Sequence, residues 1–170
     1  INGDGTIRVI YNGKSKTDKD EISIGNTSFN IKYDSPAYVG YMYGNPDGKT
    51  FDEVHSNTND STVKLLVDDW YKVNVYDNNY NDFVSISGGF CGDRETTGNG
   101  VSKTVTTYFE GYNRHSINKA IFKCSNLNRD LYTTNDSERG NKSLTYPVGL
   151  ITYDELVYAG LDGKHLNKLS

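Results

Sequence analysis

The chain has 170 residues, and its 18 Lys and Arg against 22 Asp and Glu give a formal net charge of −4. This balance argues against a nucleic-acid-binding protein, whose affinity comes from cationic side chains that displace counterions along the phosphates. No apolar run approaches the roughly 20 residues that a membrane-spanning helix needs, so we expect no membrane insertion by this segment. Length and apolar content favour a single folded domain over residues 1–170.

The composition favours sheet and loop over helix. The sequence holds three alanines against 19 asparagines and 17 glycines, and the latter two types prefer turns and caps to helix interiors. The apolar residues are largely Val, Ile, Tyr and Phe, which pack well on a pleated surface. We therefore expect short strands, long loops and few helices.

The first predicted strands lie in the N-terminal quarter of the chain. Residues 6–11 are apolar and β-branched and are bracketed by Asn-Gly turn signals. We expect the charged residues 14–21 to form an exposed loop or hairpin tip, with Ile22 and Ile24 in a short return strand. Residues 37–43 form a second apolar run, which ends in a turn at 44–48.

One longer helix is predicted over residues of about 60–75. Val63, Leu66, Val67 and Trp70 follow the spacing of one helix face, and charged residues including Lys64 and Asp68 fall on or near the opposite face. Asp60 or Ser61 is placed to cap its first turn. At this spacing Trp70 is typical of a core anchor, and the alternative is a tryptophan in a binding site.

The second half of the chain is predicted to hold two further strands and one short helix. Residues 83–87 form an apolar run, and residues 101–109 alternate between apolar and polar side chains, as in a half-buried strand. We expect the polar residues 130–142 to be irregular. Thr152 and Glu155 have the spacing of a capping box, which predicts a helix over about 153–159.

The two cysteines, Cys91 and Cys124, predict a disulfide. An even count without a CxxC motif in a polar chain indicates an oxidising compartment, and closing this loop would stabilise the fold by roughly 3–4 kcal/mol. The alternatives are two separate buried thiols in a cytosolic protein, or a redox-active or nucleophilic cysteine. Neither cysteine lies in a recognisable reactive motif.

Motifs for catalysis or metal binding are not apparent. The three histidines are far apart and lack a second His or Cys at ligand spacing. Asp68 and Asp69 adjoin on the predicted helix and point about 100° apart, so they do not form a catalytic carboxylate pair. Asp154 and Glu155 are interpreted as helix caps. We therefore predict no catalytic residues, no bound metal and no cofactor.

The most unusual feature is the stock of 14 tyrosines and 19 asparagines. Tyrosine offers a large, stiff contact area with a polar tip, and asparagine offers adaptable hydrogen bonds, a mixture typical of recognition surfaces. The same mixture also fits an ordinary β-sheet surface, so both interpretations stay open.

Seven segments, spread in order over nearly the whole chain, form a distinctive set: residues 2–13 (NGDGTIRVIYNG), 37–44 (AYVGYMYG), 69–71 (DWY), 89–94 (GFCGDR), 111–114 (GYNR), 122–124 (FKC) and 141–152 (NKSLTYPVGLIT). Through these segments the chain resembles a family of uncharacterised extracellular domains in gut Firmicutes. It implies the C-type-lectin-like fold of formylglycine-generating-enzyme relatives, in a pilin-like or other anchored surface protein. Family members usually continue into a closing strand, so we expect a domain truncated at its C-terminus.

Together these observations predict an extracellular or cell-surface domain of α+β, C-type-lectin-like type, with a Cys91–Cys124 bridge. The favoured function is a non-enzymatic interaction module, a pilin-like or adhesin head that binds protein or glycan through Tyr- and Asn-rich loops. One alternative is a structural subunit that forms a homo-oligomer or filament, completed by a neighbouring chain. Another is an enzyme, either related to formylglycine-generating oxidases or a hydrolase assembled from distant residues.

Overall fold

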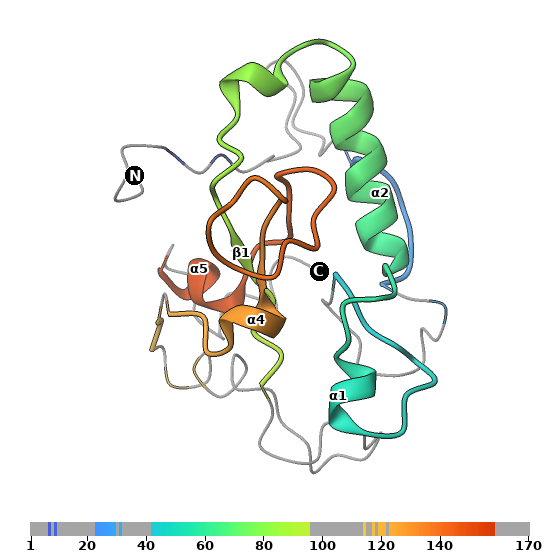
Figure 1. The fold of residues 1–170 in the computed structure, drawn as a ribbon, viewed down its shortest axis with the longest axis vertical. Coiled ribbons are helices and arrows are strands. Elements are labelled where there is room, and N and C mark those ends of the chain that lie inside the picture. Colours follow the sequence, from blue (N-terminus) through green and yellow to red (C-terminus); the bar gives the residue numbers. More distant parts are fainter. Residues whose placement is uncertain are drawn as a thin grey trace.

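The computed structural model describes residues 7, 9, 23–29, 31, 42–95, 114, 117, 119–121 and 123–158. Within them the elements are, in chain order, α1 (Phe51–Val54), α2 (Thr62–Tyr71), the π-helix η2 (Lys72–Tyr76), the 3₁₀-helix η3 (Asn81–Phe83), β1 (Phe90–Cys91), α4 (Leu127–Asp130), β2 (Leu131–Tyr132) and α5 (Tyr153–Tyr158) (Figure 1). The structure is a small α+β fold, as the composition predicts. The strand predicted at 101–109 and most of those at 6–11 and 37–43 lie outside the described residues.

Local capping sets where the helices begin. Ser61 caps α2 by accepting a hydrogen bond from the backbone N–H of Lys64, which confirms the predicted start. The capping box at α5 is also confirmed, because Thr152 Oγ1 accepts from the N–H of Glu155 and the Glu155 carboxylate accepts from the N–H of Thr152. A second capping box, between Thr50 and Glu53, begins the short helix α1, which is not among the predicted elements.

The buried side of α2 differs from the predicted one. Lys64, expected on the polar face, is buried together with Val67 and Tyr71, whereas Trp70 is half-buried. Lys64 tolerates burial because its ammonium forms ion pairs with Asp60 at 3.1 Å and Asp68 at 2.6 Å. After Tyr71 the chain continues as the π-helix η2, whose wider turn shifts the helical phase.

Two predictions for shorter segments are wrong. Residues 83–87 do not form a strand, because the N–H groups of Phe83 and Val84 donate to the carbonyls of Tyr80 and Asn81 in the η3 turn. Of the predicted return strand, Ile22 lies outside the described residues, and Ile24 lies in a bend instead. There the hydroxyl of Ser23 bonds to the backbone of Gly25 and holds a local turn.

The core lies where β1 and β2 pair. The two strands are antiparallel, with Phe90 opposite Tyr132 and Cys91 opposite Leu131. Met42, Tyr43, Tyr132 and Leu144 form the buried apolar cluster, against which Phe90 and Leu150 pack. The Tyr43 and Tyr132 rings meet edge to face with their centroids 5.0 Å apart.

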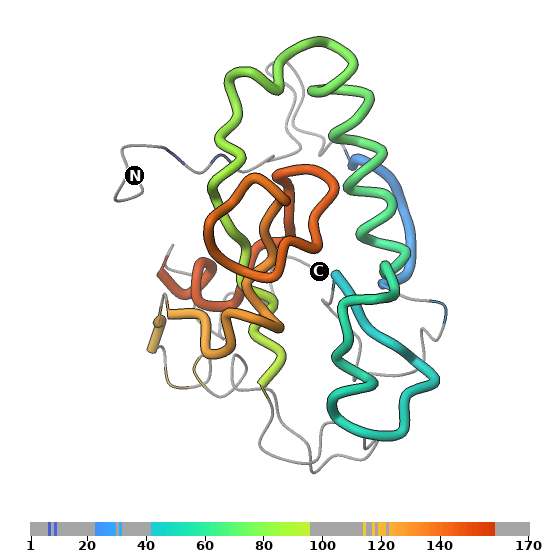
Figure 2. The backbone as a smooth tube through the Cα atoms, in the orientation of Figure 1, coloured from blue at the N-terminus to red at the C-terminus, as the bar shows by residue number. Residues whose placement is uncertain are grey.

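The segment 130–142, predicted to be irregular and polar, is instead part of the core. It supplies the last residue of α4, all of β2 and the buried residues Thr133, Thr134 and Ser137. The hydroxyls of Thr134 and Ser137 donate to the carbonyls of Ile86 and Ser87, so polar side chains satisfy the backbone of the neighbouring segment. Figure 2 shows this orange segment wound against the yellow-green stretch that leads into β1.

A buried ion pair joins these segments. Arg94 and Asp130 are both fully buried, and Nε of Arg94 donates to Oδ1 of Asp130 at 2.8 Å. The other guanidinium nitrogens of Arg94 donate to the carbonyl of Tyr43 and to Oδ1 of Asn57. One side chain therefore ties the segments before α1, after α1 and at the end of α4 to the strand region.

Candidate functional site

The two cysteines predicted to pair do form a disulfide. Cys91 in β1 and Cys124 before α4 are bonded, with Cα atoms 5.6 Å apart and a sequence separation of 33. This finding removes the alternatives of two separate thiols and of a free nucleophilic cysteine at these positions. The bridge lies beside the β1–β2 pair and fixes the start of α4 near β1.

A second cluster of charge lies next to this bridge. The Arg114 guanidinium binds both carboxylate oxygens of Asp154, at 3.0 and 2.7 Å, and also pairs with Asp93. The N–H of Ile121 donates to the same Asp154 carboxylate. Asp154 therefore does not cap α5 as predicted; its carboxylate holds Arg114 and the segment at Ile121 in place.

Electrostatics at this cluster follow from burial. Removal from water raises the pKa of Asp93 although Arg114 lies beside it and opposes the shift. Across the described ranges no group of three or more His, Cys, Asp or Glu side chains is placed to hold a metal ion. The arrangement is that of a structural ion-pair network, with each carboxylate already engaged by the arginine.

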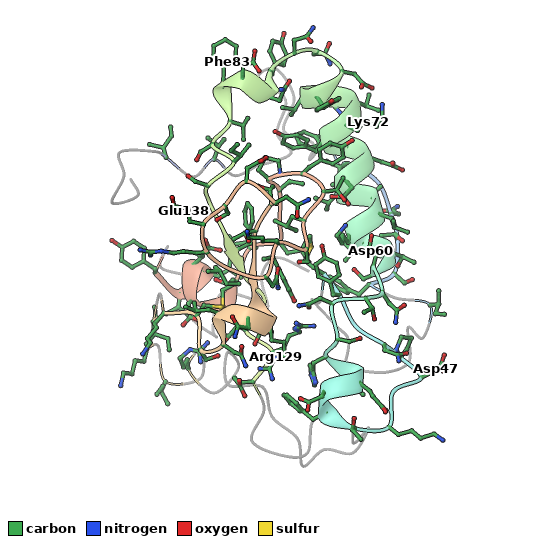
Figure 3. The ribbon with its side chains drawn as sticks, in the orientation of Figure 1. Asp47, Asp60, Lys72, Phe83, Arg129 and Glu138 are labelled. Atoms are coloured by element: carbon green, nitrogen blue, oxygen red, sulfur yellow. A yellow bond between two sulfur atoms is a disulfide. The ribbon has the colours of Figure 1, made fainter. Side chains whose placement is uncertain are left out.

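Residues 72–86 form one end of the molecule, here called the aromatic tip. This end is the candidate interaction surface. It includes η2, η3 and the loop between them, and Figure 3 places Phe83 at the opposite end of the view from Asp47. Its sequence is rich in tyrosine and asparagine, the composition that the sequence analysis associates with recognition.

Large apolar side chains of the aromatic tip face solvent. Phe83 is 87% exposed and Tyr80 is 57% exposed. Three further tip residues are also exposed, namely Val73, Tyr76 and Ile86. A gathering of large apolar groups within fifteen consecutive residues is the kind of surface that marks interaction sites, unlike the single exposed apolar residues found on most proteins.

The backbone of the aromatic tip is held by its own hydrogen bonds. The N–H of Asp77 donates to the carbonyl of Lys72 at 2.9 Å, that of Tyr80 to Val75 at 2.9 Å, and that of Phe83 to Tyr80 at 3.0 Å. The side chains of Asn74 and Asn78 donate to the carbonyls of Trp70 and Val73. These two asparagines thus satisfy carbonyls of the widened helical turn and stabilise the tip.

Aromatic stacking fastens the aromatic tip to the rest of the molecule. The Tyr146 ring lies 5.2 Å from the buried Tyr71 ring and 5.7 Å from the Tyr76 ring, measured between centroids. Burial raises the pKa of Tyr71, so its hydroxyl stays protonated at neutral pH. The tip is a fixed platform whose inner side is packed and whose outer side carries exposed rings.

Comparison with known proteins assigns neither a family nor a function to this chain. No family model, curated protein or solved structure matches this chain. In the part of the chain that the structure describes, none of the helices is long and apolar enough to cross a bilayer.

Proposed function

We propose that this domain is a non-enzymatic interaction module, secreted or displayed on a cell surface, that binds a protein partner through the aromatic tip. The Cys91–Cys124 disulfide supports the extracellular placement, because such bonds persist in oxidising compartments. We further propose that the fold is of the C-type-lectin-like kind, the expectation that the sequence resemblance provides.

The observation that carries the proposal is the exposure of Phe83 on a hydrogen-bonded platform. Aromatic side chains supply much of the energy of protein interfaces, and Tyr80 lies within the same tip. Because the backbone is already ordered by internal hydrogen bonds, binding has little conformational entropy to lose. A rigid, apolar surface of this kind fits a complementary apolar pocket on a folded protein.

The test is binding of the fluorescently labelled domain to cultured epithelial cells, measured by flow cytometry. We expect Phe83→Ser to weaken binding by about tenfold or more, because it removes a buried aromatic contact from the complex. Leu65→Ser is the matched control, because Leu65 is 52% exposed on α2, outside the tip, and its replacement should leave binding unchanged.

Two further treatments identify the partner. Trimming the cell surface with protease should abolish binding if the partner is a protein, whereas enzymatic removal of glycans should leave it intact. Equal binding by wild type and Phe83→Ser, or loss of binding only after glycan removal, would contradict the proposal.

A further inference from the structure

A groove between the turn that precedes α1 and the start of α2 has no part in the proposed function. Described residues line an open cavity of about 270 Å³ there, formed by the turn at 43–47, the segment 59–62 and Ile31. Its polar lining consists of Asn45, Asp47, Asn59, Asp60, Ser61 and Thr62. This volume is just below the roughly 300–1,000 Å³ of pockets for drug-sized molecules, so the groove suits a small ligand.

The two walls of the groove are joined by backbone hydrogen bonds. The N–H of Gly44 donates to the carbonyl of Asn59 at 3.1 Å, and the N–H of Ser61 donates to the carbonyl of Met42 at 2.9 Å. Tyr43 and Asp60 form the antiparallel bridge between these bonds. The groove is therefore preformed, and a ligand entering it would not have to order its walls.

The carboxylate of Asp60 is held in place at the groove by a buried lysine. The Lys64 side chain is 1% exposed, and its Nζ lies 3.1 Å from Oδ2 of Asp60. Burial opposes the charge on Lys64, but hydrogen bonds to Asp68 and Asp60 outweigh burial and raise the lysine pKa, so Lys64 stays charged. The other Asp60 oxygen, Oδ1, accepts no hydrogen bond from any described residue, and the side chain is 39% exposed.

The chemistry of the lining favours hydroxyl groups. Carboxylates only accept hydrogen bonds, whereas amide side chains such as that of Asn59 both donate and accept. A cation would use only the acceptors, but a group of neighbouring hydroxyls would use both kinds of partner. We propose that this groove binds a small polyhydroxylated ligand, such as one sugar ring, with a ligand hydroxyl donating to Oδ1 of Asp60.

The test is an NMR titration of the ¹⁵N-labelled 170-residue chain with D-glucose, D-galactose and D-mannose. We expect at least one sugar to give saturable shifts of the Gly44, Asn59 and Ser61 amide signals. Asp60→Asn keeps the shape of the side chain but removes the charged acceptor, and should weaken that binding about tenfold. Asp136→Asn is the matched control, because Asp136 is an exposed carboxylate in the loop after β2, outside both the groove and the aromatic tip, and its variant changes the net charge equally.

If Asp60→Asn does not fold, Asn59→Ala provides the same test through the amide on the rim. Methylammonium chloride serves as the cationic probe. Absence of saturable shifts with all three sugars, equal sugar affinity in Asp60→Asn and wild type, or stronger binding of methylammonium than of any sugar would each overturn the proposal. None of these results depends on the partner of the aromatic tip.

Discussion

Asp130 is fully buried, and its carboxylate accepts hydrogen bonds from two arginines. Arg94 Nε and Arg129 Nη2 each lie 2.8 Å from one of its oxygens. Taking charges out of water is costly, and the network balances that cost only while both signs are present. We expect Asp130→Ala to lower the free energy of unfolding by about 3–5 kcal/mol, because Arg94 would remain as a buried charge without its carboxylate.

Urea denaturation followed by circular dichroism measures this loss. Asp77→Ala is the control, because it breaks the exposed ion pair with Lys72, and its unfolding midpoint should match that of wild type. A midpoint for Asp130→Ala as high as that of the control would show that the buried pair is not required for the fold.

This pair could not be predicted from the sequence. Charged residues are mostly exposed in folded proteins, and a run such as 130–142 therefore indicates a solvated loop. The partners that make burial tolerable are remote, since Arg94 is 36 positions from Asp130 in the chain. The burial of Lys64 could not be predicted either, because acidic residues at positions i−4 and i+4 are also typical of an exposed helix face.

At the residue scale, His55 makes the stability of the fold depend on pH. It is fully buried, and burial lowers its pKa below the ordinary 6.5, while its Nδ1 donates to the carbonyl of Phe51 at 2.7 Å. Between the lowered folded pKa and 6.5 the unfolded chain binds more protons than the folded one. Stability from this group is therefore complete above pH 6.5 and falls as the pH drops below it, by at most about 1.4 kcal/mol per pH unit.

Urea midpoints of wild type and His55→Gln between pH 7.5 and 5 measure this contribution. We expect the wild type to lose stability more steeply with acid than the variant, whatever their difference at neutral pH. Parallel curves for the two proteins would show that His55 does not titrate differently in the folded and unfolded states.

At the scale of elements, helices can be predicted where the residues that specify them are close in sequence. The apolar spacing and Ser61 predict α2, and the Thr152–Glu155 pair predicts α5, because capping depends on residues within one turn. The strands β1 and β2 have two residues each, too few to carry any alternation. The segments that hold them are also joined by the disulfide and by the Arg94–Asp130 ion pair, which are contacts between distant parts of the chain.

The turn after β2 depends on a glycine. Gly140 has a φ of +80°, and a Cβ there would meet the Leu131 carbonyl oxygen at 2.6 Å. We expect Gly140→Ala to lower the free energy of unfolding by about 2 kcal/mol or more, from backbone strain and this contact together. Gly88→Ala is the matched control, since a Cβ there has open space, and its stability should be unchanged or raised by up to about 1 kcal/mol.

Thermal or urea unfolding of both glycine variants makes the comparison. If the two substitutions lowered the free energy of unfolding equally, the left-handed backbone at Gly140 would not be required for this turn. The carbonyl of Leu131 also accepts the N–H of Asn141 at 2.9 Å, so near-ultraviolet circular dichroism of Gly140→Ala should report loosening around Tyr132.

At the scale of the whole molecule, the sequence predicts the covalent link and the α+β fold class but not the surface proposed for binding. The disulfide follows from two cysteines without a metal-binding spacing. The exposed aromatic tip could not be predicted from the sequence, because Val73 continues the apolar spacing of α2 and Phe83 begins an apparent strand. In the structure Val73 lies in the π-helix η2 and Phe83 in η3, and both side chains are exposed.

The disulfide stabilises the molecule mainly by restricting the unfolded chain. At a sequence separation of 33 between Cys91 and Cys124, closing the loop contributes roughly 3–4 kcal/mol in the chain-entropy account. We expect reduction of the wild type to lower the free energy of unfolding by that amount, and the double variant Cys91→Ser, Cys124→Ser to equal the reduced wild type.

Urea denaturation with and without a phosphine reductant separates the effect of breaking the disulfide from an effect of the reductant itself, because the stability of the double variant should not change. A wild type that is equally stable in both conditions would mean that the bond adds no stability beyond that of contacts such as the Arg94–Asp130 pair. Mass spectrometry of the alkylated protein shows in the same samples whether the bond was present.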